Sequence, residues 1–259
     1  MKAISFGSYS HVGMVRKENQ DFFGKFPEDN LDLAPAKGQL FVVADGMGGH
    51  NAGRDASELA VNILTHYYFT IPNDDIAESL RQAFQGTNEH IYHYGTHSPE
   101  HAGMGTTCVA LVLQDNHACI GSIGDSRIYR ITKRRIQQLT QDHSKVAELV
   151  RRGILTKEEA KTHPERSHLY RALGTKPVAE VDVIGNINLK NDEYFLMCTD
   201  GLYNHVSDKE MQQLVIANEP EPACRALVEL ANERGGQDNI TVQIIHVTEP
   251  RGILGKILR

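Results

Sequence analysis

The sequence predicts an α+β fold in which antiparallel sheets pack face to face, with helices on the outside. Short strand-like runs recur along the chain, at 40–44, 106–113, 118–123, 127–131, 194–198 and 241–247. Several of them alternate apolar and polar residues, as 128–131 does, which is typical of a strand with one buried face. Short polar turns at 114–117 and 132–134 favour antiparallel hairpins.

Helical patterns fall between these runs, and capping residues mark where they begin. The acidic cluster at 73–75 precedes a segment, 76–91, whose apolar residues recur every three to four positions. The pairs Thr156 with Glu159 and Ser207 with Glu210 each indicate a capping box. A further helix is predicted through 223–232, ending at two glycines.

The stretch 142–174 differs from the rest of the chain. It holds two short helical pieces and many charges, with little apolar periodicity. We interpret it as an excursion from the core that acts as a lid or substrate-contacting insert, with a long solvated connection as the alternative.

Composition excludes several classes of protein. The 259 residues include 27 Lys and Arg against 33 Asp and Glu, a net charge of −6 that offers no field for nucleic acid or an anionic membrane. No run approaches the ~20 apolar residues of a membrane span, and the first residues lack the apolar core of a signal peptide. We therefore expect a cytoplasmic protein of one domain. Its four cysteines are expected to be reduced: Cys108, Cys119, Cys198 and Cys224.

One pattern occurs twice, far apart in the sequence. Two apolar strand-like runs lead directly into Asp45-Gly46 and Asp200-Gly201. A carboxylate at the end of a buried strand is partly desolvated, so its charged form is costly unless something positive lies close. The glycine lets the backbone approach that partner and can offer its own carbonyl oxygen.

Three more aspartates accompany this pattern. Asp125 and Asp238 lie in tight polar turns, and Asp21 follows an Asn-Gln pair. If these segments converge, four or five carboxylates share one small site, and their repulsion favours divalent cations. Ligation by oxygen alone selects hard ions such as Mg²⁺ or Mn²⁺, and two such ions can activate a water for attack on a phosphoryl group.

Rival sites fit less well. The glycine-rich run 46–53 lies between a strand and a helix, but Asn51 stands where a dinucleotide-binding turn needs glycine, and no P-loop lysine is present. Four histidines recur at near-helical spacing without the further ligands that zinc requires. They are His90, His93, His97 and His101. The basic C-terminal tail, 249–259, could dock a partner or membrane surface, with packing on its own domain or fraying as the alternative.

The residues resemble those of a known family, the type 2C metal-dependent serine/threonine protein phosphatases. Eight motifs occur in the family's order: VRKENQD (15–21), VADGMGGH (43–50), GMGTT (103–107), GDSR (124–127), DHS (142–144), RALG (171–174), TDGL (199–202) and GQDN (236–239). The form of the second motif resembles the bacterial branch. The match covers about residues 5–248, read here as one catalytic domain, 1–248.

The resemblance implies a four-layer α-β-β-α sandwich with 142–174 as a flap beside the site, and two to three Mn²⁺ or Mg²⁺ ions. It implies that Asp45 bridges two metals, with the Gly46 carbonyl on the second, and that Asp21 acts there through water. The first metal would be held by Asp200 and Asp238, and a third by Asp125 with Asp200. Arg16 would grip the substrate phosphate through its planar pair of donors.

Two positions depart from the family's pattern. Gln20 stands where many relatives carry an acidic residue, which removes one charge near the second metal. Met47 stands where the animal branch has a histidine that protonates the leaving group, so the general acid stays open between His50 and a water on the third metal.

The expected function is hydrolysis of phosphoserine and phosphothreonine in proteins, opposing a protein kinase that would itself be among the substrates. The alternatives are a catalytically silent relative that binds phosphoproteins or a kinase, and a small-molecule phosphoesterase. Because the four aspartates of the metal motifs are all present, the enzyme is favoured. We expect a monomer that binds no nucleic acid and does not insert into membranes.

Overall fold

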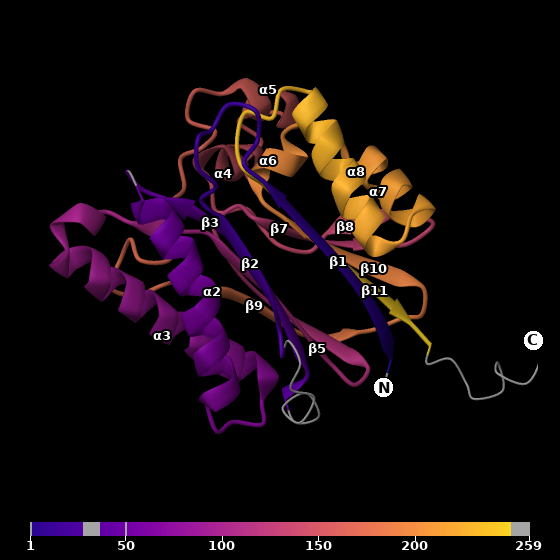
Figure 1. Cartoon of the computed structure of the whole chain (residues 1–259), viewed down its shortest axis with the longest axis horizontal. Coiled ribbons are helices and arrows are strands. Elements are labelled where there is room, and N and C mark those ends of the chain that lie inside the picture. The colour runs from indigo at the N-terminus through magenta and orange to yellow at the C-terminus, as the bar shows by residue number, and fades with distance from the viewer. Residues whose placement is uncertain (1, 28–36, 50, 250–259) are drawn as a thin grey trace, which may run out of the picture.

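The structure is a computed structural model that describes residues 2–27, 37–49 and 51–249 (Figure 1). Two antiparallel sheets form its centre. One has the order β1 (Ala3–His11), β11 (Ile240–Thr248), β10 (Glu193–Cys198), β7 (Arg127–Ile131) and β8 (Ile136–Gln138). The other has the order β2 (Asp21–Phe26), β3 (Gln39–Met47), β5 (Cys108–Gln114), β6 (His117–Ile123) and β9 (Asp182–Asn188), with β4 (Gly105–Thr106) added to β3.

Helices cover both outer faces. In Figure 1, α2 (Ala52–Thr70) and α3 (Ile76–His97) lie on the β2–β9 sheet, while α7 (Asp208–Ala217) and α8 (Pro220–Glu233) lie on the β1–β8 sheet beside the short α6 (Asp200–Tyr203). The predicted α+β sandwich with helices outside is thus confirmed. The segment 142–174 carries the two expected short helices, α4 (Lys145–Arg151) and α5 (Lys157–Thr162), and a single 3₁₀ turn, η1 (Pro99–His101), follows α3.

Strand alternation separates the buried side chains into layers. On β3, Leu40 and Val42 pack toward α2 and α3, whereas Phe41 and Val43 belong to the cluster between the sheets. On β10, Phe195 likewise points between the sheets, and its neighbours pack toward the other helices. A central apolar layer therefore lies between two outer ones, which makes four layers of secondary structure.

The local signals in the sequence are largely confirmed. Asp75 caps α3 by accepting hydrogen bonds from the amides of residues 77 and 78, and both capping boxes are present. The run expected at 106–113 is divided at Thr107 into β4 and β5, although the Thr107 amide still donates to the Asp45 carbonyl of β3 at 2.9 Å. All four cysteines are free and buried. Across the described ranges, no helix has the length and apolar character needed to cross a bilayer.

Candidate metal centre

Asp45 continues the inward-facing row of β3. It is the next residue on that face after Phe41 and Val43, so the row changes from apolar to acidic at the end of the strand. Asp21, the first residue of β2, is paired directly with Asp45 in the antiparallel ladder. Residues opposite each other in such a ladder point to the same face, so both carboxylates lie between the sheets.

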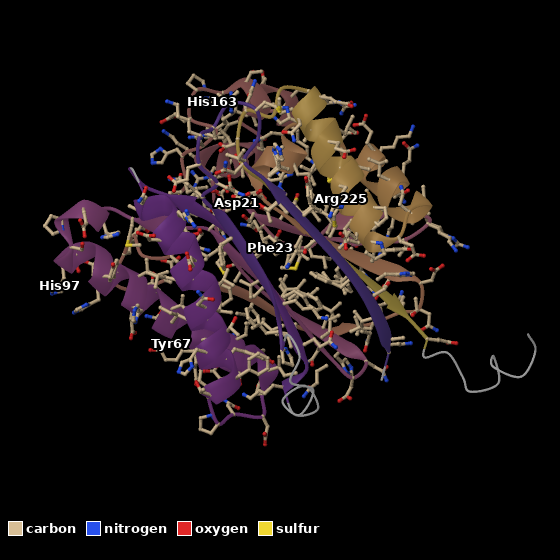
Figure 2. All side chains as sticks on the ribbon, viewed as in Figure 1. Asp21, Phe23, Tyr67, His97, His163 and Arg225 are labelled. Carbon is tan, nitrogen blue, oxygen red and sulfur yellow. The ribbon has the colours of Figure 1, made fainter. Side chains whose placement is uncertain are left out.

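Asp21, which is labelled in Figure 2, connects the two sheets by accepting hydrogen bonds from hydroxyl groups. Its Oδ2 accepts hydrogen bonds from Thr241 on β11 at 2.7 Å and from Thr199 at the end of β10 at 2.9 Å. Its Oδ1 is buried and has no hydrogen-bond partner. A buried carboxylate oxygen without a partner is costly, and an oxygen-seeking cation is one group that would satisfy it.

The β1–β8 sheet contributes Asp200 and Asp238. Asp200 is the first residue of α6, directly after β10, and accepts a hydrogen bond from Asn204 at 3.1 Å. Asp238 lies in the loop before β11, where its Oδ2 forms an ion pair with Arg16 at 2.8 Å. Arg16 is half exposed, so the guanidinium lies at the solvent side of the carboxylates.

Asp125 lies in the tight turn between β6 and β7. Gly124 before it has a φ of +97°, a left-handed conformation that favours glycine. The Asp125 carbonyl accepts a hydrogen bond from the Tyr203 hydroxyl at 3.1 Å, which ties the turn to α6. The side chain of Asp125 is buried.

The glycines after the two strand-end aspartates allow a close approach of backbone segments. A Cβ on Gly46 would lie 1.9 Å from the Gly53 carbonyl oxygen, and one on Gly201 would lie 2.0 Å from the Asn239 carbonyl oxygen. Each glycine therefore allows a second stretch of backbone to cross at the strand end. This crossing brings the start of α2 beside Asp45, and the loop that carries Asp238 beside Asp200.

The aspartates raise one another's pKa. Burial, followed by the charges of Asp21, Asp200, Asp125 and Asp238, raises the pKa of Asp45 well above its usual range. Burial is also the main cause that raises the pKa of Asp21 to about 7, of Asp125 to about 8 and of Asp200 to about 6. The metal-free carboxyls therefore hold their protons to a higher pH than exposed ones, and a nearby cation would favour their charged forms.

This donor set fits hard divalent cations, because the acidic side chains that meet at the site are all aspartates and offer oxygen alone. The carboxylates are nevertheless engaged elsewhere: Asp238 with Arg16, Asp200 with Asn204 and Asp21 with two threonines. Accordingly, no group of three or more Asp, Glu, His or Cys side chains in the described part of the chain is already arranged around one point. That holds also for the helical histidines, of which His93 and His97 stack on each other.

Comparison with known proteins agrees with this site. The model of the family described as protein phosphatase 2C matches residues 17–241. The chain belongs to the protein phosphatase 2C family. A relative in Listeria monocytogenes named "Serine/threonine phosphatase stp" is 37% identical over 238 residues, covering 90% of this chain and 92% of that protein. "Protein phosphatase PhpP" of Streptococcus pneumoniae is 37% identical over 92% of this chain and 95% of its own length.

Solved structures of the family share the fold. The Streptococcus agalactiae serine/threonine phosphatase superposes with a TM-score of 0.85 at 32% identity, covering 95% of this chain and all of the other. The catalytic domain of the phosphatase PstP, solved in complex with two manganese ions, gives 0.81 at 30% identity, with 96% and 100% covered. Membership in the protein phosphatase 2C family places the chain among the protein serine/threonine phosphatases.

Some residues of the site escaped the sequence analysis. Thr199 and Thr241 hold Asp21, but the sequence assigned neither of them a role: Thr199 stands inside the TDGL motif, and Thr241 lies outside every motif. Thr107 accepts a hydrogen bond from the Asp45 amide and contacts Ser126 at 2.7 Å. His50, one candidate for the general acid, lies outside the described residues.

Proposed function

We propose that this protein hydrolyses phosphoserine and phosphothreonine in proteins, using two to three Mn²⁺ or Mg²⁺ ions. The observation that carries the proposal is the meeting of five aspartates from both sheets at one end of the sandwich, in a member of the protein phosphatase 2C family. Residues 1–248 would form one catalytic domain, with the flap at 142–174. The basic tail beyond residue 249 lies outside the described residues.

Each ion would be held by the aspartates that the family resemblance assigns to it. Asp45 would serve both core ions, with the Gly46 carbonyl on the second and Asp21 contributing through water. Asp200 and Asp238 would hold the first ion, and Asp125 with Asp200 a third. When bound, such ions supply an activated water and neutralise the charge that develops on the phosphoryl group.

Arg16 would bind the substrate phosphate. Its guanidinium lies at the solvent side of the carboxylates, where a phosphoserine side chain would enter, and offers two parallel donors. Asp238 holds it there at 2.8 Å. A cation on Asp238 would compete with this ion pair and leave the guanidinium donors available to the phosphate.

The leaving serine alkoxide needs a proton, and Met47 has none to give. The donor is therefore either a water at the ions or a residue such as His50. The substrates would be phosphorylated proteins, among them a protein kinase that this enzyme opposes. The enzyme would act as a monomer in the cytoplasm.

The test is hydrolysis of para-nitrophenyl phosphate and of phosphoserine, phosphothreonine and phosphotyrosine peptides, with Mn²⁺, Mg²⁺ or EDTA. Asp238→Asn is compared with Glu221→Gln, which makes the same change of charge on the outer helix α8, where Glu221 pairs with Arg225. We expect metal-dependent turnover of the first two peptides, lost in EDTA and in Asp238→Asn but kept in Glu221→Gln. A folded wild-type protein without turnover in any metal would instead support the silent phosphoprotein-binding relative.

A further inference from the structure

The turn that presents Asp125 is held by one buried histidine. The Gly124 amide donates to His143 Nδ1 at 3.1 Å, and the His143 amide donates to the Gly124 carbonyl at 2.9 Å. Gly124 itself cannot be replaced easily, because a Cβ there would lie 2.6 Å from Thr107. The residue before Asp125 is thus held by two hydrogen bonds to His143 at a point where Thr107 leaves no room for a side chain.

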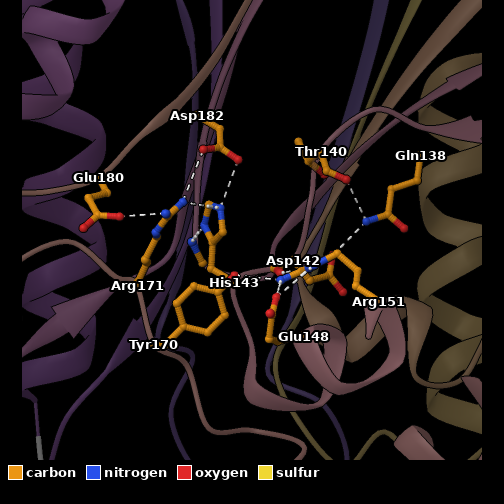
Figure 3. Close-up of polar contacts among 11 residues, drawn as sticks. Gln138, Thr140, Asp142, His143, Glu148, Arg151, Tyr170, Arg171, Glu180 and Asp182 are labelled. Carbon is orange, nitrogen blue, oxygen red and sulfur yellow. Dashed lines mark hydrogen bonds and ion pairs between the residues drawn. The ribbon is translucent and has the colours of Figure 1, made fainter. Parts of the chain in front are cut away.

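The hydrogen bonds determine the tautomer of this histidine. Because Nδ1 accepts from an amide, the ring proton lies on Nε2, which faces Asp182 Oδ2 at 3.1 Å (Figure 3). His143 is fully buried, and burial lowers its pKa. Asp182 therefore orients the imidazole so that Nδ1 points at the turn.

Both ends of the flap meet at the same residue. The Tyr170 amide donates to the His143 carbonyl at 3.0 Å, and Ser144 pairs with Leu169 as an isolated bridge. Near the end of the flap, Arg171 contacts Asp182 at 3.3 Å and Glu180 at 2.6 Å, as Figure 3 shows, and its Nη1 lies 3.4 Å from His143 Nε2. His143 is therefore bonded to Tyr170 of the flap, to Asp182 on β9 and to the Asp125 turn.

We propose that His143, oriented by Asp182, is a positioning residue that holds the Gly124–Asp125 turn and joins the base of the flap to it. The inference rests on the proposed function, since Asp125 would be a metal ligand there. A partner that orients a ligand from behind commonly changes metal affinity by about 10–100-fold when it is lost. Loss of the histidine acceptor should accordingly weaken metal binding at Asp125, whereas a purely space-filling histidine would affect stability alone.

Two pairs of variants separate these roles. Asp182→Ala removes the group that orients the ring at a half-exposed position, and Glu180→Ala is its control because it removes an ion pair with the same Arg171 without touching the histidine. His143→Leu removes the acceptor, while His143→Asn places an oxygen close to where Nδ1 lies. The second pair tests the hydrogen bond apart from the packing.

Three measurements are made on each full-length variant. They are the Mn²⁺ concentration for half-maximal hydrolysis of para-nitrophenyl phosphate, the Mn²⁺ affinity by calorimetry, and hydrogen exchange in the peptide 120–127 of the metal-free protein. For His143→Leu we expect a Mn²⁺ requirement about tenfold higher and faster exchange at 120–127. Asp182→Ala should shift both in the same direction, Glu180→Ala should match the wild type, and His143→Asn should recover most of the loss while KM stays unchanged.

Two results would overturn the inference. One is an Asp182→Ala protein that matches Glu180→Ala in both Mn²⁺ affinity and exchange. The other is a folded His143→Asn protein that is as impaired as His143→Leu. A wild type without metal-dependent turnover would overturn the proposed function instead, and the exchange at 120–127 would still decide whether His143 holds the turn.

Discussion

Asp21 and Asp45 are direct partners across the β2–β3 ladder, with both carboxylates facing the space between the sheets. Like charges placed opposite each other in a ladder destabilise it. The pair is tolerated because Asp21 is held from the other sheet by Thr199 and Thr241, at 2.9 and 2.7 Å. The raised pKa of both carboxyls also limits their repulsion in the metal-free protein, and a divalent cation would stabilise their charged forms.

Removing one of these charges should have opposite effects on the stability of the metal-free protein and on its metal binding. In Asp21→Asn the side chain keeps an oxygen for the two threonine hydroxyls but loses the repulsion with Asp45. We expect the metal-free variant to be more stable by about 1 kcal/mol, roughly 2–4 °C in thermal midpoint for a chain of this size. The further increase on adding Mn²⁺ should be smaller than in the wild type. Calorimetric melting in EDTA and in Mn²⁺ measures both, and Asp21→Ala, which leaves the hydroxyls without their acceptor, should melt lower.

Gly46 and Gly49 offer a matched pair of glycine substitutions three residues apart. A Cβ on Gly46 would overlap the Gly53 carbonyl, whereas a Cβ on Gly49 would meet nothing within 4 Å. Gly46→Ala should therefore lower the free energy of unfolding by about 2–3 kcal/mol, and Gly49→Ala by much less. Urea unfolding compares the two. Equal effects would show that the crossing of backbones at the end of β3 has room to relax.

Substitutions of Arg16 should act on substrate binding with little effect on folding, because the side chain is 53% exposed. A charge-assisted hydrogen bond is worth about 1.5–3 kcal/mol, so we expect Arg16→Ala to raise KM for phosphopeptides by roughly 10–100-fold. The KM of Arg16→Lys should lie between those of the wild type and Arg16→Ala, since lysine keeps the charge but lacks the paired donors. Steady-state kinetics at saturating Mn²⁺ provide the measurement. An unchanged KM would move phosphate binding to another group.

The capping box of α7, which is not part of the metal centre, should make the stability of the protein depend on pH. Hydrogen bonds from Arg234, and then from Ser207, lower the pKa of Glu210 below its usual range. A carboxyl whose pKa is lowered on folding stabilises the protein fully at pH values above its pKa in the unfolded chain, near 4.5. That stabilisation is lost as the pH falls toward the pKa of the group in the folded protein. The thermal midpoint of Glu210→Gln should therefore lie below that of the wild type at pH 7, and the difference should shrink toward pH 3. A constant difference would exclude this ionisation as its cause.

The sequence predicted the strands whose residues are mostly buried and missed those whose residues are mostly half-buried or exposed. The strands found are β3, β5, β6, β7, β10 and β11. β9 was missed, because its residues are largely exposed and Gly185 interrupts it. β1 and β2 were missed for a related reason: they are half-buried, each contains a glycine, and their partners lie far along the chain.

The site residues that could be predicted are those that stand in a recognisable local sequence pattern. Asp45 and Asp200 follow apolar strands and precede glycines, a pattern that a single sequence displays. The groups that hold the aspartates in place are not displayed in this way. The contact of Asp21 with Thr241 spans 220 residues, and that of His143 with Asp182 spans 39, so both depend on how the strands pair.

The division of the aspartates between two sheets also bears on the order of folding. Asp21 and Asp45 come from one sheet, while Asp200 and Asp238 follow or precede strands of the other. Their common site cannot exist until the two sheets have docked, so a divalent ion stabilises the docked state and not the states that precede it. Such a ligand slows unfolding and leaves the folding rate nearly unchanged. The ions would then extend the lifetime of the folded enzyme as well as equip it for catalysis.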